Sequence, residues 1–429
     1  MVVVERARNP FHILKTQRNF RLFWSGQTLS LIGTWMQSMA QGWLALELTN
    51  SPLLVGLVAS IGALPIVFFS LPAGVLVDRH DKLRLVTIGQ ALLATQALLL
   101  WWFVWTGHIT IGWLLALAAM NGLVASLEIP ARQSLIIELV GRAELGSAIA
   151  LNSSGFNLAR VIGPSVAGLV IARLGLAWCF GLNAMSYSMV LLSLVMIRLP
   201  RWAADASRPT AWAGFVEGLH YMRSTPEVVF LIRIVMAYAV LGVPFIALMP
   251  VIARDMLGTG AGGYGLLLGS VGAGGLAGAL VLAGMLHHVP RMTLLPRACM
   301  AFAALLLALS FVRTPVLAYP ILFGAGFSMI VNSAVANELL QTVVPDAMRG
   351  RVMALYALIV IGLSRVVGAF AGGVVADAVG IDWSIGASAA LLLGFTAWIF
   401  SRPPAALPVS PPGEPTPGDV PLVVPVQPE

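Results

Sequence analysis

The stretch Asn157–Gly175 reads NLARVIGPSVAGLVIARLG, and a related stretch, GLSRVVGAFAGGVVADAVG, follows 205 residues later at Gly362–Gly380. At this offset an arginine and three glycines coincide: Arg160 with Arg365, Gly163 with Gly368, Gly168 with Gly373 and Gly175 with Gly380. Four coincidences at one offset indicate that the chain consists of two related halves.

Both stretches lie in apolar runs long enough to cross a bilayer. The chain is 59% hydrophobic and only 10% charged, whereas soluble domains carry about 25% charged residues. A crossing helix needs about twenty mostly apolar residues. We therefore expect twelve crossings: Leu22–Leu46, Leu53–Val77, Leu85–Thr106, Ile109–Leu127, Leu145–Ala172, Leu174–Ile197, Val228–Ile252, Gly260–Leu286, Met292–Val312, Val316–Ala336, Val352–Ala376 and Trp383–Phe400.

The predicted fold is an all-α membrane protein with twelve transmembrane helices in two parallel-repeat six-helix halves, because the matching stretches form the fifth and eleventh helices. Apolar residues at helical spacing after residue 211 predict an amphipathic helix between the halves. Ten prolines in the last 27 residues predict a disordered tail. The expected segments are 1–21 (cytoplasmic), 22–198 (first half), 199–227 (linker with the amphipathic helix), 228–401 (second half) and 402–429 (cytoplasmic tail).

The basic residues define the orientation. Nineteen of the 25 Lys and Arg residues lie in alternate connections, counted from the N-terminus, and only three lie on the opposite side. Cytoplasmic loops carry such an excess, so both termini are expected in the cytoplasm of a cell whose inner (plasma) membrane the protein crosses. Because the charge is spread in this way, the net charge of +7 does not indicate nucleic-acid binding.

The sequence contains no motif for a metal, a cofactor or an enzyme reaction. Its two cysteines, Cys179 and Cys299, lie inside apolar runs, so neither a disulfide framework nor a metal site is expected. No hydrolase or nucleotide-binding motif is present. We expect a non-enzymatic protein without cofactors.

Several motifs resemble the major facilitator superfamily. The turn Gly74-x-x-x-Asp78-Arg79, followed by Arg84, looks like its signature loop, and Gly163-Pro164 resembles a sequence of its antiporter branches. The segments SLIGTWMQSMAQGWLALELTNSPLLVGL, IPARQSL, IALNSSGFNLARVIGP and VPDAMRGRVMALY resemble the bacterial subgroup of enterobactin exporters and macrolide efflux proteins. One departure is Thr34, where many of these exporters carry an aspartate.

Three of the charged residues within or at the ends of the apolar runs are candidates for function, because an ionised group there costs about 2.5–3.5 kcal/mol on insertion scales. Arg160 and Arg365 are candidates for binding an anionic or carbonyl-bearing substrate or for forming a central ion pair; the alternative is a structural pair between helices. Glu128 is the candidate for proton coupling, and the alternative is that it is a fixed partner of Arg132 or Arg160.

Charged residues of both signs cluster at the predicted cytoplasmic ends of the helices and form a candidate gate: Asp78, Arg79, Arg84, Arg132, Glu138, Glu338, Arg349 and Arg351. The family resemblance implies that Asp78 lies near the start of the eleventh helix and latches the outward-facing state. Ordinary membrane topology explains the arginines equally well. A further set is interpreted as helix hinges or packing positions: Gly163, Pro164, Gly168, Gly368 and Gly373.

The resemblance implies a secondary transporter that works by alternating access. We expect proton-coupled efflux of a small amphipathic or siderophore-like molecule by a monomer in contact with membrane lipids. One alternative is proton-coupled uptake, or lipid transport, on the same fold. A second is a membrane scaffold or receptor that transports nothing.

Overall fold

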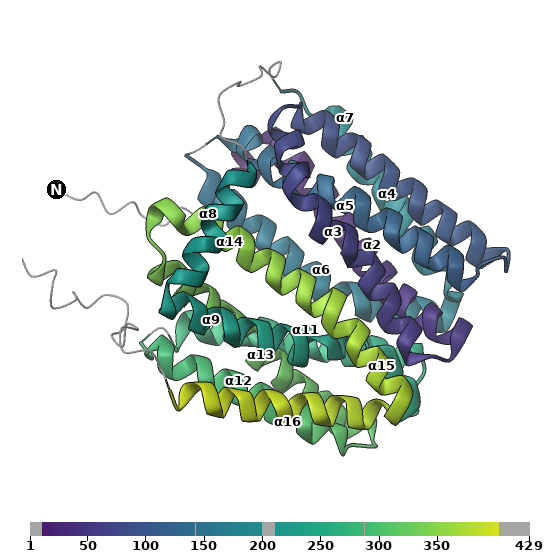
Figure 1. The fold of residues 1–429 in the computed structure, drawn as a ribbon. Coiled ribbons are helices and arrows are strands. Elements are labelled where there is room, and N and C mark those ends of the chain that lie inside the picture. Colours follow the sequence, from purple (N-terminus) through teal and green to yellow (C-terminus); the bar gives the residue numbers. More distant parts are fainter. Residues whose placement is uncertain (1–10, 142, 200–210, 287, 403–429) are drawn as a thin grey trace, which may run out of the picture.

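A computed structural model describes residues 11–141, 143–199, 211–286 and 288–402. Most of the predicted tail at 402–429, and parts of the predicted segments 1–21 and 199–227, lie outside the described residues. The described part contains helices and no strands. In Figure 1 the helices of the first half (purple to blue) and of the second half (green to yellow) form two groups, and α8 (Ala211–Ser224) lies beside α14.

The first half follows a short helix, α1 (His12–Thr16), and has six crossings. Side chains cap the starts of three of them: Ser51 Oγ accepts from the Leu54 amide, Asp81 Oδ1 from the Arg84 amide and Thr110 Oγ1 from the Trp113 amide. The six helices are α2 (Arg18–Thr49), α3 (Pro52–Asp78), α4 (Lys82–Trp105), α5 (Ile111–Val140), α6 (Leu145–Leu174) and α7 (Ala177–Met196).

The second half also has six crossings, but two of them are irregular. Proline has no amide hydrogen to donate, so Pro244 and Pro250 interrupt its first crossing. The fifth contains a wider π-helical turn. The crossings are α9 (Pro226–Ala237) with η1 (Tyr238–Gly242), η2 (Val243–Ile246), α10 (Met249–Val251) and η3 (Ile252–Met256); α11 (Ala261–Gly284); α12 (Arg291–Ser310); α13 (Pro315–Val343); α14 (Asp346–Ile361) with η4 (Gly362–Gly368) and α15 (Ala369–Val379); and α16 (Ile381–Phe400).

Eleven helical segments of the described chain are long and apolar enough to cross a membrane. The remaining crossing, α2, is 32 residues long but less apolar, because it carries buried polar side chains such as Gln27 and Gln37. With α2 the described chain has the predicted six crossings in each half.

The repeat is visible in the packing of the helices. The contact of α3 with α5 has its counterpart in α11 with α13, and that of α4 with α7 in α12 with α16. Between the halves, α6 packs on α11 and α3 packs on α15. Gly175 (φ 90°) and Gly380 (φ 96°), a matched pair in the sequence, both end the repeated helix in a conformation that favours glycine.

Glycines bring the helices together at both helix contacts between the halves, α6 with α11 and α3 with α15. A Cβ on Gly168 would lie 3.2 Å from the Cα of Gly265 on α11. A Cβ on Gly56 would clash with the carbonyl oxygen of Ala369 and lie 3.4 Å from the Cα of Gly373 on α15. Small residues permit such close approach of helix backbones in membranes. The repeat therefore places a glycine pair at each of these two contacts between the halves.

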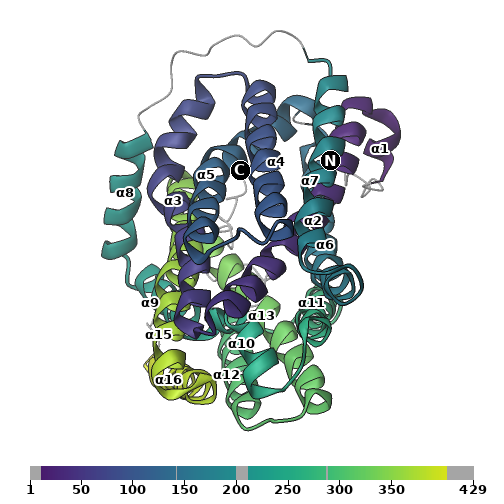
Figure 2. The ribbon, with the colours of Figure 1, turned by 90° about the vertical axis from the view of Figure 1, so that its right-hand side faces the viewer.

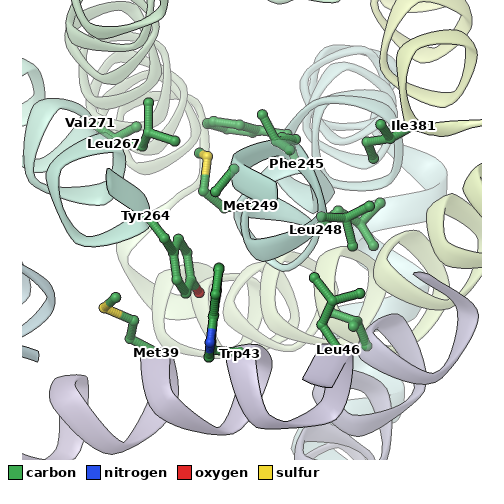
Figure 3. Close-up of a cluster of buried hydrophobic side chains, with 14 of the residues drawn as sticks. Met39, Trp43, Leu46, Phe245, Leu248, Met249, Tyr264, Leu267, Val271 and Ile381 are labelled. Carbon is green, nitrogen blue, oxygen red and sulfur yellow. The ribbon is translucent and has the colours of Figure 1, made fainter. Parts of the chain in front are cut away.

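The two halves share an apolar core at one end only. Figure 3 shows that core, where Trp43 of α2 stacks on Tyr264 of α11 with ring centroids 5.8 Å apart, and Leu46 lies near Leu248. We call this the Asn50 end, after the residue that follows α2. At the opposite end, the α8 end, one apolar cluster contains only first-half residues, and another only residues of α8 and the second half. The bundle is therefore joined at the Asn50 end and divided at the α8 end.

The close contact of α3 with α15 at Gly56 predicts the effect of adding one methyl group there. We expect Gly56→Ala to destabilise the protein by about 1–3 kcal/mol, because the new Cβ overlaps backbone that cannot move without separating the halves. Thermal unfolding of the purified protein measures this.

Gly74→Ala on the same helix is the matched control, because nothing lies within 4 Å of a Cβ added there. Equal melting temperatures for the two variants would contradict the packing role of Gly56.

Candidate functional site

Glu128 lies inside the first half, and only 4% of its surface is exposed. Its Oε1 accepts a hydrogen bond of 2.8 Å from Nε2 of Gln90 on α4 and one of 3.0 Å from Nε of Arg132, one turn further along α5. Gly89 permits this approach, because a Cβ there would lie 3.1 Å from the Cβ of Glu128. The carboxylate is thus held between two helices with an arginine as its ionic partner.

Amide side chains extend this polar interior along the first half. Gln90 Nε2 also lies 3.4 Å from Oε1 of Gln27 on α2. Nearer the Asn50 end, Asn183 donates to Gln37 (2.8 Å), and Gln37 donates to Gln96 (3.0 Å). These amides are not among the predicted site residues, although uncharged polar residues in apolar runs are the signal that would have found them.

Arg160 projects from α6 toward the second half. Its side chain is half-buried, and Nη2 lies 3.4 Å from the position that a Cβ on Gly275 of α11 would occupy. Glu128 pairs with Arg132 and not with Arg160. Within the described residues Arg160 has no acidic partner.

Arg365 lies in the π-helical turn η4, at the position of the second half that matches Arg160. Its side chain is exposed, whereas its neighbours Ser364 and Gly368 are buried. Ser60 of α3 donates to the backbone carbonyl of Arg365 (2.9 Å), which ties this turn to the first half. The described part of the chain offers the Arg365 side chain no acidic partner either.

The charged residues at the α8 end form ion pairs along each half. Lys82 pairs with Glu138 (3.6 Å) in the first half, and Arg291 pairs with Glu338 (2.8 Å) in the second. Arg349 pairs with Asp346, and Arg351 pairs with Glu217 of α8, each at 2.6 Å. Asp78 is half-buried and has an interaction partner, while Arg79 and Arg84 are exposed. Lys82, Arg291, Asp346 and Glu217 were not among the predicted gate residues.

Polar contacts between the halves are found at the Asn50 end. Arg254 of η3 donates to Oδ1 of Asn50 (2.7 Å) and to the carbonyl of Leu46 (3.3 Å). Ser51 Oγ donates to Oδ1 of Asp377 on α15 (2.7 Å). These contacts were not predicted, because each residue appears in the sequence as a single polar residue near a helix end.

The matched glycines Gly163 and Gly368 lie at equivalent contacts within their halves. A Cβ on Gly163 would lie 2.5 Å from the Cβ of Trp35 on α2, the first crossing of its half. One on Gly368 would meet Pro244 of η2, which belongs to the first crossing of the second half. Pro164 is buried within α6, which continues through it.

Two six-helix halves that are joined at one end, the first with a buried polar interior, are typical of a membrane transporter. The chain matches the family described as transmembrane secretion effector over residues 9–409 and belongs to it, within the major facilitator superfamily. It is a multi-pass membrane transporter and not an enzyme.

Relatives of this chain include siderophore and drug transporters. The chain is 25% identical over 273 residues to the staphyloferrin A transporter of Staphylococcus aureus (63% of this chain, 68% of that one). It is 27% identical over 381 residues to the multidrug efflux pump Tap of Mycolicibacterium fortuitum (86% and 92%). It is 26% identical over 346 residues to the enterobactin exporter EntS of Shigella flexneri (80% and 82%).

Solved structures show the same fold. A bacterial homologue of the human lysosomal transporter Spinster, in an inward-facing and unoccupied conformation, matches with a TM-score of 0.70 at 14% identity, covering 89% of this chain and 95% of that one. A bacterial homologue of the iron transporter ferroportin, in an inward-facing state, matches with a TM-score of 0.68 at 15% identity, covering 90% and 99%.

The contacts at the Asn50 end predict that Asp377→Ala loosens that end. We expect spin labels at the exposed positions Leu48 and Val379 to show a longer distance in this variant, because the Ser51–Asp377 hydrogen bond between the halves is lost. Double electron–electron resonance measures the distance.

Asp382→Ala is the control, because Asp382 pairs with Arg313 inside the second half (2.6 Å). An unchanged distance in Asp377→Ala, or an equal change in both variants, would contradict the role of Asp377 in joining the halves.

Proposed function

We propose that this transporter exports a small amphipathic or siderophore-like molecule by alternating access, in exchange for protons. The observation that carries the proposal is Glu128, the one acidic side chain of the described residues that is fully buried. A buried carboxylate beside an arginine is a group whose protonation changes its interactions. A monomer suffices, since its two halves form one pathway.

The orientation of the charges supports a cytoplasmic α8 end. In the sequence, nineteen of the 25 Lys and Arg residues belong to one set of alternate connections and three to the other, and the described connections of the first set, such as the one between α3 and α4, lie at the α8 end. The structure then corresponds to an inward-facing state in the bacterial inner membrane: the halves are separate toward the cytoplasm and packed together at the outside. In this state an exporter receives its substrate from the cell.

Proton exchange at Glu128 follows from its hydrogen bonds. The ionised carboxylate accepts from Arg132 and Gln90. Protonation neutralises the carboxylate and weakens its ion pair with Arg132. The guanidinium group of Arg132 is then available to another acidic side chain. In the proposed cycle Glu128 takes up a proton in the outward-facing state and releases it to the cytoplasm. Thr34, which replaces the aspartate of many related exporters, bonds instead to the carbonyl of Ser30.

Arg160 and Arg365 are the proposed substrate contacts. Unpaired guanidinium groups in a membrane-spanning segment are costly unless they face water or an anion. Two of them, at matching positions of the two halves, suit a ligand with several anionic or carbonyl oxygens. Relatives named as transporters of staphyloferrin A and enterobactin support a siderophore-like substrate.

The proton-coupling role of Glu128 is tested in proteoliposomes. We expect Glu128→Gln to lower flux driven by a pH gradient at least tenfold while exchange of labelled for unlabelled substrate continues, because only the exchange needs no net proton movement. Metal-free enterobactin and staphyloferrin A are the first substrates to measure.

Glu47→Gln is the control: this carboxylate is exposed and accepts from Trp43 Nε1, which a glutamine oxygen also does. Wild-type flux in Glu128→Gln would overturn the coupling assignment. Substrate entering cells together with protons would show uptake, the alternative on the same fold.

The substrate role of the two arginines predicts weaker binding when either is removed. We expect Arg160→Ala and Arg365→Ala to reduce the ligand-induced rise in melting temperature, because a ligand that binds the folded form stabilises it. The exposed Arg173, in the last turn of α6, provides the control Arg173→Ala. Equal stabilisation of all variants would exclude both residues from the substrate site.

A further inference from the structure

A groove opens between the halves on the side formed by α3, α8, α9 and α14 with η4. Its volume is about 630 Å³, and its lining is almost entirely apolar, including Leu64, Phe68, Met236 and Leu363. Figure 2 shows α3, α8 and α9 along one side of the molecule. The groove has the chemistry of a hydrocarbon site.

A smaller cavity of about 340 Å³ adjoins the groove and is basic. The two cavities share Arg223, Val229 and Arg233, and the smaller one adds Arg402. The three arginines come from different elements: the last turn of α8, the middle of α9 and the residues after α16. The fold, not a run of sequence, brings them together.

These arginines have no anionic partner within the described residues. All three side chains are exposed, and none takes part in an ion pair. Arg402 lies over the ring of Trp398 at 5.9 Å, a contact that leaves its hydrogen-bond donors available. Glu227, the acidic residue nearest in sequence to the cluster, lines neither cavity. Among residues 11–141, 143–199, 211–286 and 288–402, no acidic side chain therefore compensates the positive charge of the cluster.

Arg233 is the arginine of the cluster whose charge is most costly, because of its position in the membrane. It lies seven residues into α9, about 10 Å along the helix, within a membrane-spanning segment. An unpaired guanidinium there is costly, and a long arginine side chain relieves the cost by extending toward the headgroups. A phosphate accepts paired hydrogen bonds from guanidinium groups and compensates their charge.

We infer that this surface binds an anionic phospholipid of the inner leaflet, with its phosphate on Arg223, Arg233 and Arg402 and an acyl chain in the apolar groove. Basic pockets between helices at the cytoplasmic side recognise such headgroups. The inference depends on the proposed orientation of the α8 end but not on the substrate or its direction of transport.

The groove is bordered by both halves of the protein. It is lined by Val67 of the first half and by Leu358 and Gly362 of the second, and a Cβ on Gly362 would lie 3.1 Å from Cγ2 of Val67, so an acyl chain in the groove would contact both halves where they meet.

The test measures thermal stabilisation of the full-length protein in neutral detergent. Dioleoyl phosphatidylglycerol is titrated against dioleoyl phosphatidylcholine, with glycerol phosphate and inorganic phosphate as headgroup controls. Of these compounds, we expect only dioleoyl phosphatidylglycerol to raise the melting temperature. The triple variant R223A/R233A/R402A is expected to need at least tenfold more of this lipid for the same rise.

R21A/R198A/R297A is the matched control, because it removes three exposed arginines elsewhere. If the triple variant does not fold, Arg402→Ala, which lies beyond the last helix, is expected to weaken binding several-fold. Equal stabilisation by the two lipids, an unchanged response of the variants or an equal effect of glycerol phosphate would overturn the lipid site. No transport is measured, so such a failure would leave the proposed export untouched.

Discussion

The close contact of helix backbones at two glycine pairs is the constraint on which the rest of the structure depends. Gly168 meets Gly265 and Gly56 meets Gly373, so the halves approach on both sides of the pseudo-twofold axis. In lipid there is no hydrophobic force between apolar helices, and packing must supply their association. These two glycine contacts bring the halves together near the Asn50 end, where the apolar core is shared. Toward the α8 end the two cores are separate.

Charged side chains in the membrane-spanning helices differ between the interior of the first half and the helices where the two halves meet. Within the first half Glu128 is fully paired, with Arg132 and Gln90, and is enclosed by α4 and α5. Arg160 and Arg365 lie on the helices that contact the opposite half and have no acidic partner among the described residues. A paired charge is stable in a packed interior, whereas an unpaired one needs water or a ligand. In the proposed mechanism the paired carboxylate exchanges protons, and the two arginines bind the anionic substrate.

Much of the candidate site could be identified from isolated charges in apolar runs, because such charges are rare and costly. Partners were harder to assign. Arg132 as partner of Glu128 was one of two alternatives, and spacing of four residues on a helix favours it. Gln90, Lys82 and Arg291 come from other helices, and no local pattern relates them to their partners. The contacts of Asn50, Ser51, Arg254 and Asp377 went unnoticed for the same reason.

The sequence by itself determined the helical membrane fold and its division into two halves. Backbone groups in lipid must pair within a helix, so hydropathy alone reveals crossings, and the Arg–Gly coincidences reveal the repeat. Only the tertiary structure decided which end of the bundle is joined, which acids meet which bases and that three distant arginines form one basic cavity. These features depend on distances between helices, which are set by the packing of side chains far apart in the chain.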